Sequence, residues 1–104
     1  MTKEEFMVVL EQTFERLKTL TLSKGIEYAN STDQLDNFHR QARELDVPKE
    51  VVLMVYLNKH IDAIKHYARV GRVLSEPIDG RIYDAILYLI LLLAMAEDDR
   101  KNNG

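Results

Sequence analysis

Arg81, Asp84 and Tyr88 are the residues of this sequence best suited to chemistry, because they are spaced at i, i+3 and i+7. In a helix this spacing places them on one stripe. Residues 85–96 are all apolar or tyrosine, and Asp84 is the one charged residue between Arg81 and Glu97. A carboxylate in such surroundings is costly without a cation or a metal beside it. We therefore rank a functional Asp84 ahead of a plain ion pair with Arg81.

Further candidates lie before this helix. Glu76 could reach the same end of a bundle, although acidic residues are common at helix starts because they complement the helix dipole. Residues 24–30 form a polar and aromatic connector in which Lys24 could meet a phosphate, Glu27 a metal and Tyr28 a base. Taken alone, this connector selects no ligand.

Residues 59–66 offer a second polar stripe. Lys59, Asp62 and His66 lie opposite the apolar side of a predicted helix, and a solvated face explains Asp62 and His66 best. His60 falls at the border of the apolar side, near Tyr56, where a histidine is more often structural than catalytic. The chain contains no P-loop, dinucleotide fingerprint, paired-histidine zinc motif or nucleophile elbow.

Two helices are predicted in the first half of the chain. Residues 2–5 form a capping box, so a helix is expected over residues 3–22, ending near Gly25. Ser31 or Thr32 can cap a second helix. The apolar face of that helix consists of Leu35, Phe38, Ala42 and Leu45.

Two more helices are predicted in the second half. The chain breaks at Asp46-Val47-Pro48, Pro48 suits the first turn of a third helix, and Gly71 suits its end. Ser75 can cap a fourth helix with Pro77 in its first turn. The end of the chain from Asp98 onward is polar, and we expect it to be frayed.

The fourth helix raises a packing problem. It is apolar on every side over 12 residues, too short to span a bilayer, which takes roughly 20. It is therefore expected at the centre of a soluble protein, and residues 51–57 pose the same difficulty. We predict an all-α, four-helix bundle-like domain over residues 1–98 with a polar tail at 99–104. A shared core in a homodimer or higher homo-oligomer would cover the remaining apolar surface.

Composition narrows the classes of function. The 104 residues suit one domain, and 46% hydrophobic residues are typical of a globular one. The net charge of −3 gives no basic excess for nucleic acid. Cysteine is absent, which excludes disulfides and thiolate chemistry. The acidic start of the chain does not resemble a signal peptide, so a cytoplasmic protein is expected, in the host cell if a phage encodes it, with no membrane partner.

Several of these short motifs together resemble a known family. They are Lys24-Gly25-x-Glu27-Tyr28, Leu35-Asp36-Asn37-Phe38, Lys59-His60, Glu76, Asp84 and Tyr88. This set is similar to the nucleotide modification-associated domain of phages and prophages, which is related to MazG-like nucleotide pyrophosphohydrolases. The resemblance covers about residues 22–97 and implies an all-α fold that oligomerises.

The resemblance also implies a function. MazG-like enzymes use carboxylates on neighbouring helices to bind Mg²⁺, which holds a nucleoside triphosphate for hydrolysis to the monophosphate and pyrophosphate. Asp84 and Glu76 would be catalytic, and with Glu27 they would bind the metal. The substrate contacts implied are Lys24, Tyr28, Asn37, Lys59, His60, Arg81 and Tyr88, with the cations on phosphates and Tyr28 or His60 on the base.

The sequence also departs from the family pattern. Arg81 stands where a glutamate partner of Asp84 is expected, and Lys59 and Asp62 stand where two glutamates are expected. Residues 76–79 spell the Glu-x-x-Asp pattern, but too early relative to the apolar run. Three alternatives follow: a rearranged pyrophosphohydrolase, a non-catalytic binder that sequesters nucleotides such as host immune signals, or a helical oligomerisation module.

Overall fold

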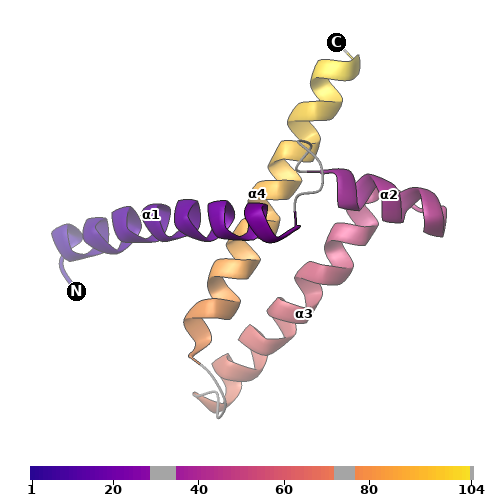
Figure 1. Cartoon of the computed structure of the whole chain (residues 1–104). Helices are drawn as coiled ribbons and strands as arrows, with labels where there is room; N and C mark the ends of the chain where they lie inside the picture. Colours follow the sequence, from indigo (N-terminus) through magenta and orange to yellow (C-terminus); the bar gives the residue numbers. More distant parts are fainter. Residues whose placement is uncertain (29–34, 72–76, 104) are drawn as a thin grey trace. The chain divides into compact units, whose positions relative to one another are not determined.

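The computed structural model describes residues 1–28, 35–71 and 77–103, and this part of the chain is all-α. For residues 23–28 it describes the backbone but not the side chains. Four helices cover the described part of the chain: α1 (Lys3–Tyr28), α2 (Asp36–Leu45), α3 (Lys49–Val70) and α4 (Ile78–Asn103) (Figure 1). None of these helices is long and apolar enough to cross a membrane. The chain divides into two compact units, Met1–Gln34 and Leu35–Gly104.

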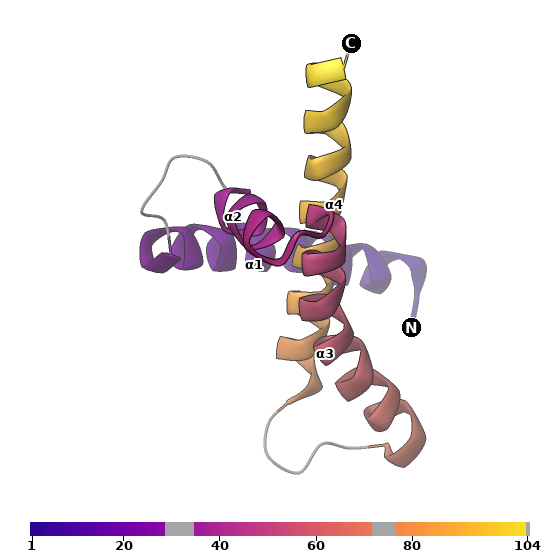
Figure 2. The ribbon, with the colours of Figure 1, turned by 90° about the vertical axis from the view of Figure 1, so that its right-hand side faces the viewer.

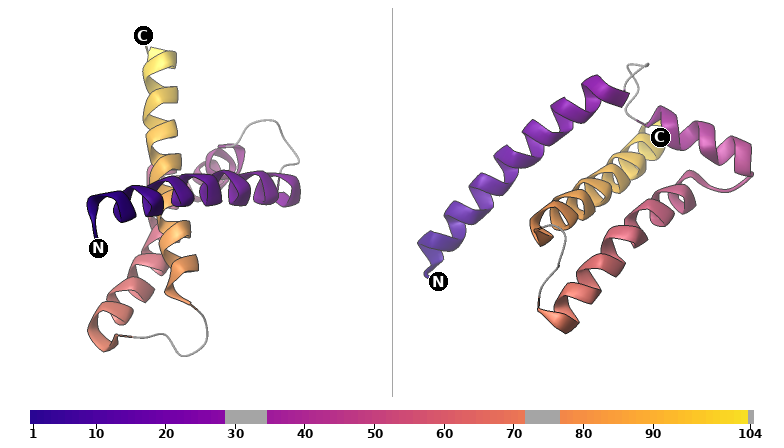
Figure 3. Two further views of the ribbon diagram at one scale, coloured as in Figure 1. Left: turned by 90° about the vertical axis from the view of Figure 1, so that its left-hand side faces the viewer. Right: turned by 60° about the horizontal axis from the view of Figure 1, so that its bottom comes forward.

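The start of α1 is the capping box that the sequence predicts. The backbone N–H of Glu5 donates to Thr2 Oγ1 at 3.1 Å, and the N–H of Thr2 donates to Glu5 Oε1 at 3.4 Å. The predicted end near Gly25 is wrong, because α1 continues as one helix to Tyr28 (Figure 3). A single interior glycine costs only about 1 kcal/mol, and good helix formers such as Lys24 surround this one. The predicted connector therefore begins inside α1.

Helix α2 begins later than predicted. Its N-cap is Leu35, whereas the predicted caps Ser31 and Thr32 lie outside the described residues. It ends at the predicted break, where Asp46 adopts the left-handed conformation with φ of 56°. Leu45 was assigned to the apolar face, but it is 65% exposed. It lies in the last turn, at the end of α2 farther from α4 (Figure 3).

Proline and glycine delimit α3 as predicted. Pro48 is its N-cap, one residue before the first turn. Gly71 is its C-cap, with φ of 77° and its N–H bonded to the Tyr67 carbonyl at 2.7 Å. Glycine adopts this left-handed conformation without steric cost. The predicted link at residues 72–74 and the Ser75 cap lie outside the described residues, and Pro77 directly precedes α4.

Helix α4 is longer than predicted at its C-terminal end. The polar residues from Asp98 onward were expected to fray, but the helix continues to Asn103. Arg100 pairs with Glu97 one turn back at 2.6 Å, and Arg100 and Lys101 lie in the last turn, where cations complement the helix dipole. Local charge pairing thus extends the helix through the tail.

Helices α2, α3 and α4 form the second unit around one small core. α3 and α4 run antiparallel and side by side, and α2 packs against α3 (Figures 1 and 2). All three helices and the residue before α2 supply core side chains, with Leu53 and Met95 fully buried. The core cluster consists of Leu35, Phe38, Val52, Leu53 and Met95. The predicted apolar face of α2 therefore packs against the first half of α3.

The expectation that α4 is covered on all sides is not met within the second unit. Ala85 and Met95 are buried on one side of the helix. Leu89 is 48% exposed and Leu93 is 68% exposed on another. Two antiparallel helices cover only one side of each other, so a helix that is apolar all round keeps an uncovered face.

Lys49 ties the start of α3 to the end of α4. Its Nζ lies 2.9 and 3.0 Å from the two carboxylate oxygens of Asp99 and 2.9 Å from Glu50 Oε1. The hydrogen bond to Asp99, and then that to Glu50, raises the pKa of Lys49 above its ordinary value of 10.5. The hydrogen bond from Lys49 lowers the pKa of Glu50 below its ordinary 4.5. The Lys49–Glu50 ion pair therefore stabilises the fold most between pH 4.5 and pH 10.5, where both residues are charged.

We predict that Asp99→Asn lowers the free energy of unfolding by about 1 kcal/mol at pH 7, because the Lys49 side chain is only 15% exposed. Because the pKa of Lys49 is raised in the folded state, its positive charge stabilises the fold fully below pH 10.5. This stabilisation is lost as the pH rises through the pKa that Lys49 has in the folded protein. The difference between variant and wild type should therefore shrink toward pH 11 in urea unfolding followed by circular dichroism. Glu44→Gln, which breaks the exposed Arg40–Glu44 pair, is the control and should cost about 0.3 kcal/mol. An equal loss in both variants would contradict the prediction.

Candidate functional site

His60 is the buried polar residue around which the candidate site is built. It lies on α3 and is only 9% exposed. The same helix carries Leu53 and Leu57 on the side that packs into the core, and His60 follows Leu57 on that side at the i+3 position. The histidine therefore faces the neighbouring helix instead of water.

Two charged residues of α4 reach the same nitrogen of His60. Nη1 of Arg81 lies 3.4 Å from His60 Nδ1, and Oδ2 of Asp84 lies 3.8 Å from it. Arginine can only donate a hydrogen bond, so its contact requires Nδ1 without a proton. A protonated Nδ1 would instead be attracted to the Asp84 carboxylate. A proton on Nδ1, which one neutral tautomer and the imidazolium both carry, favours the contact with Asp84, and its absence favours the contact with Arg81.

Aromatic rings connect this group to the rest of the second unit. The ring of Tyr88 stacks on His60, with ring centres 5.5 Å apart, and on Tyr56, with centres 6.1 Å apart and an angle of 1°. Phe38 meets Tyr56 edge-on at 6.2 Å. Offset stacked and edge-to-face rings at these separations are mutually attractive. The stack holds His60 and Tyr88 in fixed positions.

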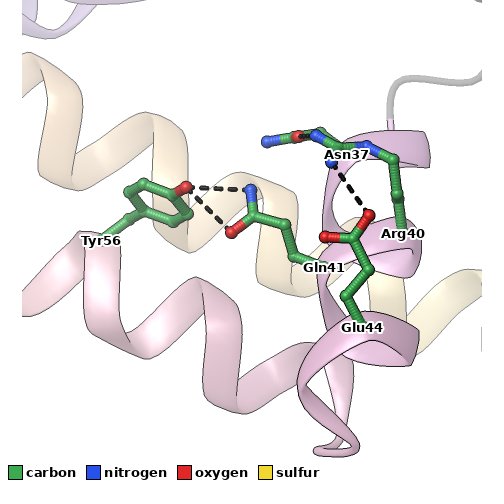
Figure 4. Close-up of polar contacts among 5 residues, drawn as sticks. All are labelled: Asn37, Arg40, Gln41, Glu44 and Tyr56. Carbon is green, nitrogen blue, oxygen red and sulfur yellow. Dashed lines mark hydrogen bonds and ion pairs between the residues drawn. The ribbon is translucent and has the colours of Figure 1, made fainter.

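Helix α2 holds the far end of this stack by hydrogen bonds. Gln41 Nε2 donates to the Tyr56 hydroxyl at 2.9 Å, and that hydroxyl lies 3.1 Å from Gln41 Oε1 (Figure 4). Asn37 and Arg40 on α2 bond to each other at 2.6 Å, and Arg40 also pairs with Glu44 (Figure 4). Tyr56 is therefore fixed from α2, while the polar group of Asn37 and Arg40 belongs to the exposed side of α2.

Four of the predicted site residues come together in the structure, and we call them the His60 cluster: His60, Arg81, Asp84 and Tyr88. Lys59 is exposed, and Asn37 bonds to Arg40. Glu76 lies outside the described residues, as do the side chains of Lys24, Glu27 and Tyr28, whose backbone belongs to α1.

Sequence reasoning did not assign Tyr56 or Gln41 to the site. Tyr56 lies four residues before His60 on α3, so its spacing was a usable signal. No sequence spacing predicts the contact of Gln41, because its hydrogen bond to Tyr56 joins two helices and residues that are 15 apart in the chain. The polar side of α3 was predicted correctly, since Asp62 and His66 are exposed.

Of the three residues predicted to bind Mg²⁺, the structure describes the side chain of Asp84 only. Among the described side chains, no three acidic or histidine residues are grouped so that they could hold a metal. Asp84 is 28% exposed and could supply one oxygen ligand, which suits Mg²⁺ when substrate phosphates supply others. The other predicted ligands, Glu27 and Glu76, have side chains outside the description. Metal binding therefore stays a prediction that depends on Glu27 and Glu76.

Three comparisons with known proteins were made for the whole chain. No model of a known protein family, no curated protein sequence and no solved structure matches it.

Proposed function

We propose that the chain binds a nucleotide through its phosphates at the His60 cluster. The observation that supports this is the convergence of Arg81, Asp84 and His60 from two helices on one partly buried point. A guanidinium offers several donors in a planar fork that suits phosphate oxygens. An imidazole beside it could donate as well, and the aromatic stack keeps that imidazole in place.

Arg81 favours binding through phosphate over a site built only of carboxylates. In the family that the sequence resembles, a glutamate is expected at this position. An arginine there supplies the positive charge that a metal would otherwise bring to the phosphates. A non-catalytic binder, for instance one that sequesters signalling nucleotides, is therefore the first form of the proposal.

Mg²⁺-dependent hydrolysis of a nucleoside triphosphate is the second form. Asp84 favours it, because a partly buried carboxylate next to phosphate is unfavourable without a cation. Asp84 would supply one ligand to the metal, and a bound Mg²⁺ would neutralise phosphate charge. In a phage such an enzyme would serve nucleotide metabolism.

Isothermal titration calorimetry tests the binding that both forms require. Ribo- and deoxyribonucleoside mono-, di- and triphosphates would be titrated with Mg²⁺ and again with EDTA. Arg81→Gln should weaken binding about 10- to 100-fold, the worth of a charge-assisted hydrogen bond. Arg69→Gln, an exposed arginine near the end of α3, is the matched control and should bind normally.

Chromatography of the same mixtures separates the two forms. Pyrophosphate release that Asp84→Asn abolishes would select the enzyme. Tight binding without release, unchanged by EDTA, would select the binder. Absence of binding at millimolar nucleotide, or equal losses in Arg81→Gln and Arg69→Gln, would contradict the proposal and leave a helical interaction module.

A further inference from the structure

The side of α4 away from the His60 cluster carries a regular apolar stripe. Ile82 is 38% exposed, Leu89 48% and Leu93 68%, while Ile86 between them is partly buried and Ala96 beyond them is exposed. We call Ile82, Ile86, Leu89, Leu93 and Ala96 the α4 outer stripe. Arg81, Asp84 and Tyr88 project from a different side of the helix, where they meet α3.

The spacing of the α4 outer stripe is that of a helix-pairing seam. Its members follow one another at intervals of four, three, four and three residues, a mean of 3.5. Apolar residues at this interval stay on one side of a helix and pair with the same pattern on another. From Ile82 to Ala96 the stripe is about 21 Å long at 1.5 Å per residue. Its pattern is self-complementary, so a second copy of the same helix fits it.

The two ends of the stripe carry opposite charges. Asp79 lies three residues before Ile82, and Arg100 lies four residues after Ala96, so both continue the same spacing. In a parallel pair of helices, Asp79 would face Asp79 of the other copy, and Arg100 would face Arg100. In an antiparallel pair centred between Leu89 and Ile90, Asp79 of each copy would lie level with Arg100 of the other. Charges at the ends of a seam select orientation in this way.

We propose that the α4 outer stripe joins two copies of the chain in an antiparallel dimer with its twofold axis beside Leu89. The stripe and the adjacent Ile90, which is 45% exposed, would form the apolar centre of the interface. A stable interface of ordinary size covers about 800 Å² on each partner and has a polar rim, which the charged ends supply. The dimer does not depend on nucleotide binding and leaves a His60 cluster in each copy.

Light scattering coupled to size exclusion tests the assembly. Wild type at about 100 µM should have the mass of a dimer. The double variant Leu89→Glu, Leu93→Glu should have the mass of a monomer, because it places like charges together at the twofold axis. Leu45→Glu replaces an equally exposed leucine on α2 and should stay dimeric. Circular dichroism checks that each variant is folded.

Cysteine cross-linking tests the orientation, since the chain has no cysteine of its own. Leu89→Cys alone should form a disulfide-linked dimer under mild oxidation, because the two copies of that residue lie at the axis. A mixture of Asp79→Cys and Arg100→Cys proteins should link to each other, and Asp79→Cys alone should not. Self-linking of Asp79→Cys would overturn the antiparallel arrangement. A monomeric wild type would overturn the proposal.

Discussion

Replacing Leu53 with alanine is expected to lower the free energy of unfolding by about 3 kcal/mol. Leu53 lies at the centre of the core cluster with no exposed surface, and it packs where α2, α3 and α4 meet. Alanine would remove three buried carbon atoms and leave a cavity that three short helices cannot close without losing other contacts. The unit has few buried side chains, so no other part of its core can compensate.

Urea unfolding followed by circular dichroism at a fixed protein concentration measures this loss, because association would make the midpoint concentration-dependent. The matched control is Val55→Ala, two residues along the same helix, where the valine is 66% exposed. That variant should change stability by less than about 0.5 kcal/mol. A Leu53→Ala loss as small as that of Val55→Ala would mean that α3 does not pack as described.

Replacing Tyr88 with alanine should cost about as much stability, roughly 3 kcal/mol, and should also disorder the His60 cluster. Its ring lies between those of His60 and Tyr56, and it packs against the core cluster. Losing it would free His60 to rotate away from Arg81 and Asp84. Nucleotide binding should therefore fall even where the protein is still folded.

Tyr88→Phe separates the ring from the hydroxyl. It keeps both stacking contacts, so stability should change by less than about 1 kcal/mol and the environment of His60 should be retained. The C2 proton resonances of the three histidines report this environment directly in solution. An unchanged His60 resonance in Tyr88→Ala, or a loss in Tyr88→Phe equal to that in Tyr88→Ala, would contradict a positioning role for the ring.

Helix ends were predictable where neighbouring residues determine them. The capping box at Thr2 and Glu5, the break at Pro48 and the stop at Gly71 each depend on contacts within a few residues. The predictions failed where local signals compete. Gly25 did not end α1, since its cost is small compared with the stability of a long helix, and charge pairs extended α4 beyond Asp98.

The sequence by itself determined that the chain is all-α and that Arg81, Asp84 and Tyr88 share one side of α4, because helical periodicity relates residues on the same helix. Only the tertiary structure decided that His60 and Tyr56 of α3 join them and that another side of α4 stays uncovered within the second unit. Which faces of two helices meet depends on how side chains far apart in the chain pack together. Periodicity within one helix does not contain that information.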